Sequence, residues 1–203
     1  MAATESLVGI TPGSGQYLHA AARAVASTST EEQYVVPAEG TLPTYTAIAR
    51  GVRVNTANSH LLFVQGDGTN YVRLRRLKIR QANIATASTL DIRVLRTSTA
   101  GGGTGAISAR AFDTADTTPY AGTVQSLPST KGTEGAELLS FRLGLTASNP
   151  ITSANQEEWI AGRHNEKPII VGNATTDGFC VKNIGSSATE VDVEAEFTTS
   201  SYL

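Results

Sequence analysis

The sequence predicts an all-β fold, an antiparallel two-sheet sandwich with the jelly roll as its leading topology. Short segments in which apolar and polar residues alternate recur along the chain, as in strands that bury one face. Small residues and glycine-containing turns separate these segments, and the 203 residues include 19 glycines. Charged residues make up 17% of the chain, below the roughly 25% of typical soluble domains. No alternation of strand and helix patterns indicates a parallel sheet.

The N-terminal part of the chain differs from the rest. Residues 1–16 contain proline and glycine but no apolar period, so we expect an extended arm followed by a single sandwich domain over residues 17–203. The stretch 16–28 is ambiguous, because its alanines favour helix while its odd-numbered residues also fit one face of a strand. A short strand is expected over residues 32–37.

Alternation is strongest from residue 47 onward, and with the earlier segments it predicts about eight to ten strands. The continuous apolar run 60–65 predicts a strand buried on both faces. The stretch 99–106 predicts a flexible glycine loop, and the turn-rich region 107–134 reads as a long excursion within the domain. The expected strands cover residues 47–55, 60–65, 71–81, 89–97, 136–145, 157–162, 168–172, 178–184 and 189–198.

The segment YVRLRRLKIRQ, residues 71–81, changes phase in its middle. Its apolar residues are even-numbered up to Leu74 and odd-numbered from Leu77. A strand keeps one face buried through such a change only if it takes in an extra residue, so a β-bulge is predicted at Arg75–Arg76. In the following strand, the phase is lost at Leu95–Arg96, and we expect the strand to end there.

Charge is segregated along the sequence although the whole chain has a formal net charge of −2. Residues 50–96 hold nine basic and two acidic residues, a formal +7, and residues 134–196 hold four basic and ten acidic residues, a formal −6. We expect the basic strip of 71–81 to lie against the outward acidic row of the last strand, or against another subunit or a capsid. The candidate interface residues are Arg73, Arg75, Arg76, Lys78, Arg80, Glu190, Asp192, Glu194 and Glu196.

Binding of nucleic acid is the competing interpretation of this strip. It requires basic residues interleaved with exposed aromatic ones, and the strip offers only Tyr71, since its leucines and isoleucine are in phase with the core. We therefore expect no nucleic-acid partner. No apolar run has the roughly 18–20 residues of a membrane helix, so no membrane partner is expected either.

The sequence contains no motif that predicts catalysis, a cofactor or a metal. The three histidines, His19, His60 and His164, have no metal-ligand spacing to one another or to Cys180. His60 opens an apolar strand, where a capping or packing role is expected. Cys180 stands between two apolar residues and is expected to be buried rather than nucleophilic.

Several segments together resemble a known group of proteins. These are ANSHLLFVQGDGTNYVRLRRLKIRQA, STLDIRVLRTSTAGGGTGA, KPIIVGNATTDGFCVKN and the final VDVEAEF. They resemble virion structural proteins of tailed bacteriophages, in particular the jelly-roll proteins that decorate or cement the head. The resemblance implies a homotrimer on the capsid surface, bound to the major capsid protein, with an arm reaching over neighbouring subunits. Such a protein is made in the host cytoplasm and ends in the virion.

The leading hypothesis is therefore a non-enzymatic capsid decoration or cement protein. The alternative is a carbohydrate- or receptor-binding sandwich module of a phage tail or fibre. Sugar sites favour exposed aromatic side chains, and Trp159, the only tryptophan, is the candidate for that role. An enzyme is disfavoured because no catalytic motif is present.

Overall fold

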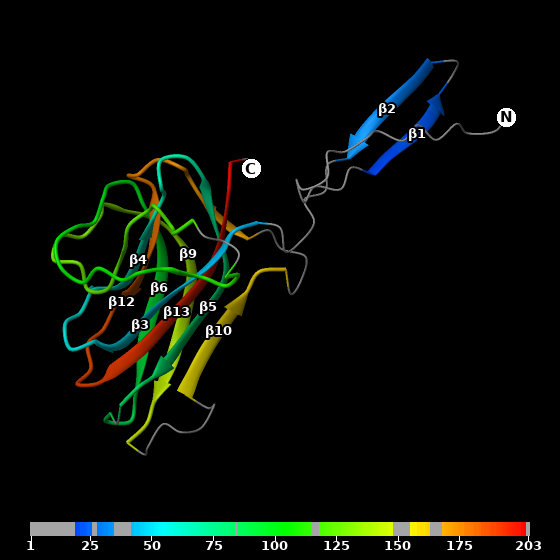
Figure 1. Cartoon of the computed structure of the whole chain (residues 1–203). Helices are drawn as coiled ribbons and strands as arrows, with labels where there is room; N and C mark the ends of the chain where they lie inside the picture. The colour runs from blue at the N-terminus through cyan, green and yellow to red at the C-terminus, as the bar shows by residue number, and fades with distance from the viewer. Residues whose placement is uncertain are drawn as a thin grey trace. The chain divides into compact units, whose positions relative to one another are not determined.

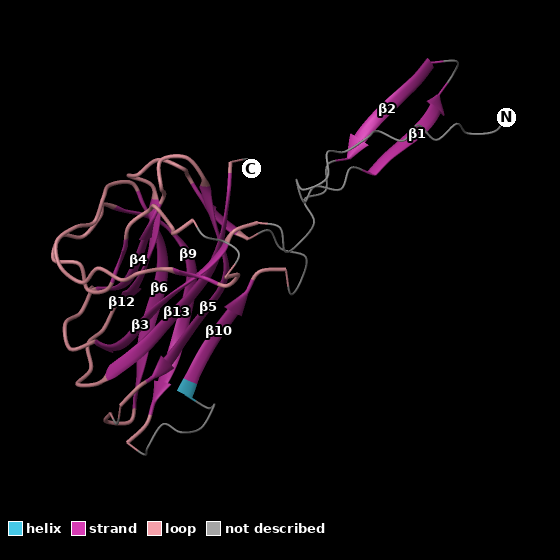
Figure 2. Cartoon of the chain, in the orientation of Figure 1, coloured by secondary structure: helices cyan, strands magenta, loops and turns pink. Residues whose placement is uncertain are grey.

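The computed structural model describes residues 19–25, 28–34, 42–83, 85–114, 118–147, 155–162 and 168–201. Strands account for nearly all of its regular structure, with one short helical turn at the start of β10 (Figure 2). The chain divides into two compact units, Met1–Leu42 and Pro43–Leu203. The predicted all-β class is confirmed.

The first unit contains a two-stranded antiparallel hairpin (Figure 1). β1 (His19–Val25) pairs with β2 (Thr28–Tyr34) in a register that runs from His19–Tyr34 to Val25–Thr28. The ambiguous alanine-rich stretch is thus a strand over these residues, in line with its odd-numbered alternation. The expected arm, residues 1–16, lies outside the described residues, as do the last three residues of the strand expected over 32–37.

The second unit consists of two antiparallel sheets packed as a sandwich, as predicted. The first sheet has the order β10-β5-β13-β3-β7, with β11 also paired to β5, and the second has the order β8-β4-β12-β6-β9. The first sheet comprises β3 (Thr44–Arg53), β5 (Tyr71–Gln81), β7 (Arg110–Ala111), β10 (Gln156–Ile160), β11 (Ile169–Val171) and β13 (Glu190–Ser200). The second comprises β4 (His60–Gln65), β6 (Ser88–Thr97), β8 (Val124–Gln125), β9 (Glu134–Leu145) and β12 (Gly178–Asn183).

Most connections between the long strands cross from one sheet to the other, whereas β6 and β9 are neighbours in the second sheet. The chain passes from β3 to β4, β5 and β6 by crossing from one sheet to the other each time, and it crosses again from β9 to β10 and from β12 to β13. Strands that are neighbours within a sheet therefore come from distant parts of the sequence, and β13 lies between β3 and β5 (Figure 1).

The core lies between the two sheets and is built from the inward residues of each strand. In β13 the predicted alternation is confirmed, because Val191, Val193, Ala195 and Phe197 are fully buried while the acidic residues between them are half-buried. The ring of Phe197 packs against two tyrosines, Tyr45 and Tyr120, at centroid distances of 5.8 and 5.0 Å. Aromatic contacts at these separations add to the burial of apolar area.

The second sheet is also covered on its outer face. All six residues of β4 are buried, which confirms the prediction for this strand. Phe63 lies outside the main core in a second cluster with Leu95 and Cys180. Gly101 of the glycine loop and Gly132 of the excursion approach the Phe63 ring so closely that a Cβ atom at either would lie within 3.1 Å of it. The glycine loop and the excursion therefore cover this cluster, and a larger residue at either glycine would require the neighbouring atoms to shift.

β6 continues to Thr97, one residue past the expected end at Leu95–Arg96. Leu95 is buried on the outer face beside Phe63 and Cys180, so an apolar residue out of phase with the main core still has a place. The turn-rich excursion contains the two-residue strands β7 and β8. Each of them pairs with a long strand at the edge of a sheet, β3 and β4 respectively.

Candidate functional site

The candidate site is the outer face of the first sheet, where basic residues of β5 lie between acidic residues of β13 and β10. β13 and β5 are antiparallel neighbours, as expected from their complementary charges. The facing pairs are Asp192 with Arg80, Glu194 with Lys78 and Glu196 with Arg76. The prediction that the basic strip lies beside the acidic row of the last strand is confirmed.

Arg76 is held between two carboxylates. Its Nε atom lies 2.7 Å from Oε1 of Glu158 in β10, and its Nη1 atom lies 2.5 Å from Oε1 of Glu196 in β13. The side chains of all three residues are less than one-third exposed. The hydrogen bond that Arg76 donates to Glu158, followed by the one it donates to Glu196, raises the pKa of Arg76 above its ordinary value. These charge-assisted bonds tie three adjacent strands together on one face.

Asp192 makes a second link across three strands. Its Oδ2 atom lies 2.8 Å from Nη2 of Arg80, and its Oδ1 atom accepts a 2.8 Å hydrogen bond from the Gly51 N–H in β3. Gly51 has a φ of +60°, at a point where the register between β3 and β13 shifts. The left-handed backbone that glycine readily adopts thus turns an N–H toward the carboxylate.

The predicted bulge in β5 is confirmed at Arg75. Glu196 faces Arg76 and the next residue, Phe197, faces Leu74, so Arg75 is the extra residue. On the opposite edge of β5, the Arg75 carbonyl accepts a 2.8 Å hydrogen bond from the N–H of Ala161, just after β10. The part of β5 that follows the bulge pairs with β10, and the part that precedes it pairs with β11. The bulge keeps one apolar face of β5 in the core along its whole length.

Not all the predicted interface residues meet. Glu190 faces Arg53 of β3, with 3.7 Å between carboxylate oxygen and Nε, and is not opposite the basic strip of β5. Arg73 lies opposite Thr198, beyond the end of the acidic row, and Arg75 occupies the bulge. The residues brought together as predicted are Arg76, Lys78, Arg80, Asp192, Glu194 and Glu196.

Glu158 was missed by the sequence analysis. It belongs to a short strand whose partner could not be inferred, since β10 and β5 are about 80 residues apart in the chain. The signal available was the glutamate pair at the start of the 157–162 segment, which places one carboxylate on each face of a strand. With Glu158 included, acidic residues flank the basic strip on both sides.

The charged face is largely compensated within the chain. Phosphate groups that approached β5 would compete with carboxylates already bound to Arg76 and Arg80. A hollow between β3, β5 and β13 on this face measures only about 20 Å³, which leaves no room for a small-molecule ligand. The arrangement therefore favours a role in strand register and in contacts with other proteins.

A second polar cluster lies on the second sheet and involves His60. Its Nε2 atom lies 3.0 Å from Oε1 of Glu134, and Oε2 of Glu134 lies 2.6 Å from Nζ of Lys182. The His60 side chain is fully buried and stacks on Phe63 at a centroid distance of 6.1 Å. The expected packing role of His60 is therefore confirmed, while its two charged neighbours were not anticipated.

Burial determines the titration of this cluster. Desolvation lowers the pKa of His60 below its ordinary value, although Glu134 opposes the change. The pKa of Glu134 is also lowered, because the hydrogen bonds from Lys182 and His60 outweigh its own partial burial. The cluster is therefore a neutral imidazole beside a Lys–Glu ion pair at neutral pH.

Cys180 is buried, as predicted, with none of its surface exposed. Burial raises the pKa of its thiol to about 12. Because the thiolate is the nucleophilic form, this cysteine has neither the ionisation nor the access that a catalytic thiol requires. Among the described residues, no three His, Cys, Asp or Glu side chains are grouped so as to hold a metal ion.

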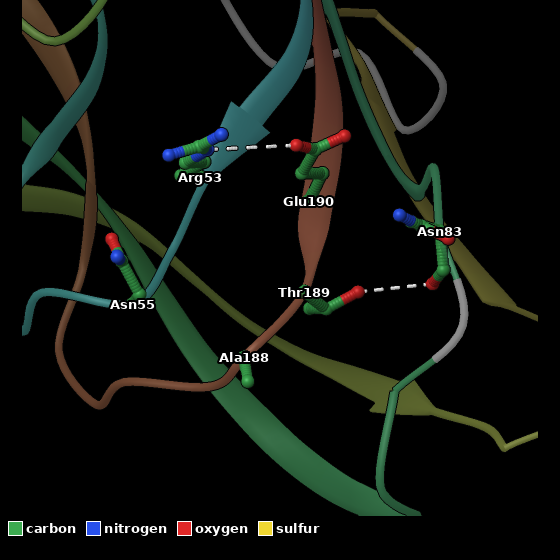
Figure 3. A pocket seen from close by; sticks show the side chains of 6 residues that line it. All are labelled: Arg53, Asn55, Asn83, Ala188, Thr189 and Glu190. Carbon is green, nitrogen blue, oxygen red and sulfur yellow. Dashed lines mark hydrogen bonds and ion pairs between the residues drawn. The ribbon is translucent and has the colours of Figure 1, made fainter.

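One polar pocket of about 240 Å³ lies at the end of the sandwich (Figure 3). Its walls come from the end of β3 and the loop after it, from the loop after β5, and from the β12–β13 loop with the first residue of β13. The Thr189 hydroxyl donates a 2.9 Å hydrogen bond to the Asn83 carbonyl. Its lining residues are Arg53, Asn55, Asn83, Ala188, Thr189 and Glu190. Trp159 is elsewhere, half-buried in β10 and packed against the core, so it does not present an exposed ring.

The described part of the chain contains no helix with the length and apolar character needed to cross a bilayer. No family model, no curated protein and no solved structure matches this chain.

Proposed function

We propose that this chain is a non-enzymatic structural protein of a tailed-bacteriophage virion, a decoration or cement protein that binds the outer surface of the head and stabilises the capsid. The observation that carries the proposal is the strand order. The long strands follow the order β10-β5-β13-β3 in one sheet and β4-β12-β6-β9 in the other. From this order we infer a jelly-roll topology, which recurs in viral capsid domains.

The charged face of the first sheet supports the same proposal. Its ion pairs hold the strands in register, which suits a domain that bears load rather than one that turns over a substrate. The partner is the major capsid protein, and the chain acts from the capsid surface after its synthesis in the host cytoplasm. Weak contacts repeated by a symmetric oligomer add up through avidity across the joints between capsomers.

The test is removal of the coding sequence from the phage that carries it, followed by electron microscopy of purified heads. Heads without the protein should lack a surface density and should break at a lower temperature than complete heads. Adding the purified protein back should restore both. Heads with unchanged density and unchanged thermal stability would refute the proposal.

The oligomeric state is a separate expectation. A homotrimer follows from the resemblance to head decoration proteins and fits the symmetric arrangement that avidity requires. Light scattering at micromolar concentration should give three times the mass of one chain. A monomeric mass under these conditions would contradict it.

A carbohydrate-binding module of a tail or fibre is the second candidate, and the polar pocket of Figure 3 is the observation that favours it. Its two asparagines, one arginine and one glutamate offer donors and acceptors for sugar hydroxyls. A glycan array should then show binding that Asn55→Ala abolishes. Trp159→Ala should leave the binding in place, because Trp159 packs against the core. Absence of binding to any glycan by the unmodified chain would remove this candidate.

A further inference from the structure

The longest described strand, β9, lies at an edge of the second sheet. Its twelve residues pair with β6 on one side, and none of the described strands pairs with it on the other. The other end of this sheet is formed by β8, which has only two residues. A long edge strand presents a row of backbone N–H and C=O groups that can pair with another chain.

The sequence of β9 limits which strand can pair there. The register with β6 shifts between Leu139 and Glu137, which makes Leu138 an extra residue. Glu137 and Arg142 are charged, and their side chains are 40% and 81% exposed. Bulges and charges on an edge oppose unselective pairing, so a strand that pairs with β9 must match both the extra residue and the two charges.

We propose that β9 pairs antiparallel with β9 of a second copy of this chain, about a two-fold axis through Ser140. This inference does not depend on the proposed function. In this register Ser140 lies opposite itself and Leu139 lies opposite Phe141 of the second copy. Because Leu138 takes up one position, Glu137 then lies opposite Arg142 of the second copy.

The faces of the two strands agree in this arrangement. Leu139 and Phe141 point inward, since both pack against the core. Arg142 and Glu137 point outward, where they already contact Asp91 and Arg93 of β6 at 3.3 and 2.8 Å. A shift by one residue would bring inward residues opposite outward ones, which the buried face does not allow.

The charges are complementary across the proposed contact. Four charged side chains form a row on the outer face. Asp91 and Arg142 of one copy come first, followed by Glu137 and Arg93 of the other copy. The sign alternates at every step, and the two-fold axis repeats the row in the reverse direction. Opposite charges in directly facing positions favour this register, and like charges disfavour a parallel or shifted one. The occupant that fits β9 best is therefore a second β9.

A cysteine on the axis provides the first test. Ser140→Cys should form a covalent dimer under mild oxidation, because the two thiols face each other across the strands. Gly144→Cys is the matched control: it lies on the same outer face and is also exposed, but it has no copy of itself opposite. The native Cys180 is buried and does not compete. Denaturing gels without reductant measure the dimer directly, whether or not the chain also forms trimers.

Charge reversal provides the second test. Glu137→Arg or Arg142→Glu alone should weaken dimerisation in sedimentation by about tenfold, since each places like charges opposite one another twice per dimer. The double variant restores opposite charges across the axis and should dimerise more tightly than either single variant. If the two substitutions acted only through the contacts with Arg93 and Asp91 of β6, their effects would add up, and the double variant would dimerise no more tightly than the single variants. Thermal unfolding of each variant checks that the sandwich is intact.

A small interface predicts weak association, so both tests run up to protein concentrations of about 0.5 mM. Ser140→Cys that stays monomeric there, or crosslinks no faster than Gly144→Cys, overturns the proposal. Equal dimerisation by all charge variants also overturns it, and would point to a strand of another protein, or to another surface, as the true contact.

Discussion

The Arg76 guanidinium and the Glu196 carboxylate meet at 2.5 Å although 120 positions of the sequence separate them. Arg76 also binds Glu158 of β10. One basic side chain of β5 thus links the two neighbours of β5 in the sheet, β10 and β13. The arginines of the other ion pairs on this face, Arg80 and Arg53, are more exposed than Arg76. Substitution of Arg76 should therefore change the free energy of unfolding more than substitution of either of them.

Replacing Arg76 by glutamate should lower the free energy of unfolding by about 1–3 kcal/mol, because two ion pairs are lost and three carboxylates become neighbours. Urea denaturation measures the change. Arg53→Glu is the control: its side chain is 73% exposed and its nearest carboxylate atom is 3.7 Å away, so a change within about 0.5 kcal/mol is expected.

Glu196→Arg combined with Arg76→Glu should recover part of the lost stability. Recovery is incomplete because Glu158 still faces the new glutamate.

A nucleic-acid site on β5 would give a different result for the single variant. In that case Arg76→Glu would leave unfolding unchanged while removing retention on DNA at moderate salt.

Deleting Arg75 should prevent folding or cost more than about 4 kcal/mol. Without the extra residue, one half of β5 must turn its apolar residues toward solvent, and each of Leu77 and Ile79 contributes roughly 1.5–3 kcal/mol by its burial. Arg75→Ser keeps the residue count and should change stability little. Circular dichroism and urea denaturation distinguish the two variants. A deletion variant as stable as the parent would show that β5 tolerates a register slip.

Stability should fall as the pH is lowered from about 7.5 to about 4. The pKa of His60 is lowered in the fold from 6.5, so the unfolded chain binds more protons as the pH drops through 6.5. The pKa of Glu134 is also lowered, from 4.5, so its contribution is lost at still lower pH. Both groups act in the same direction. The midpoint of urea denaturation at several pH values measures the trend.

His60→Gln provides the control for that trend, because glutamine retains an N–H that can bond Glu134 but does not titrate. Its stability at neutral pH should be lower, since the stacking on Phe63 is lost. Between about pH 7 and pH 5.5 its stability should vary less with pH than that of the parent. Equal slopes would exclude His60 as the group responsible.

Cys180 should resist thiol reagents in the folded protein and react rapidly in denaturant. Its surface is fully buried and its pKa is raised to about 12, so neither access nor the thiolate is available. The absorbance change with a chromogenic disulfide measures the reaction. A second thiol placed at Gly144, exposed on β9, should react at once in the same chain.

Period-2 alternation was sufficient to predict β13, β5 and its bulge, because each records in the sequence which face is buried. Charge complementarity was sufficient to predict that these two strands are neighbours. The alternation and the charge complementarity are both properties of the residues that make the contacts, so they can be read from the sequence. The antiparallel sandwich could be predicted for the same reason.

Other features depend on contacts that no local pattern records. Leu95 looked like the end of its strand because its burial comes from a loop that covers the outer face of the sheet. Glu158 could not be assigned to Arg76, since the order of strands in a sheet is set by the whole fold. The His60–Glu134–Lys182 cluster joins β4, β9 and β12 of the second sheet. Its members are spread over more than a hundred residues of the sequence.

Every other described strand of the sandwich precedes β13 in the chain, and yet β13 lies between β3 and β5. During synthesis on the ribosome, the two halves of the first sheet emerge without the strand that joins them. Folding of this sheet can finish only after β13 has left the exit tunnel, when contacts of long sequence separation become available. Nascent chains stalled before residue 190 should therefore be open to proteases and chaperones, and completed chains should not.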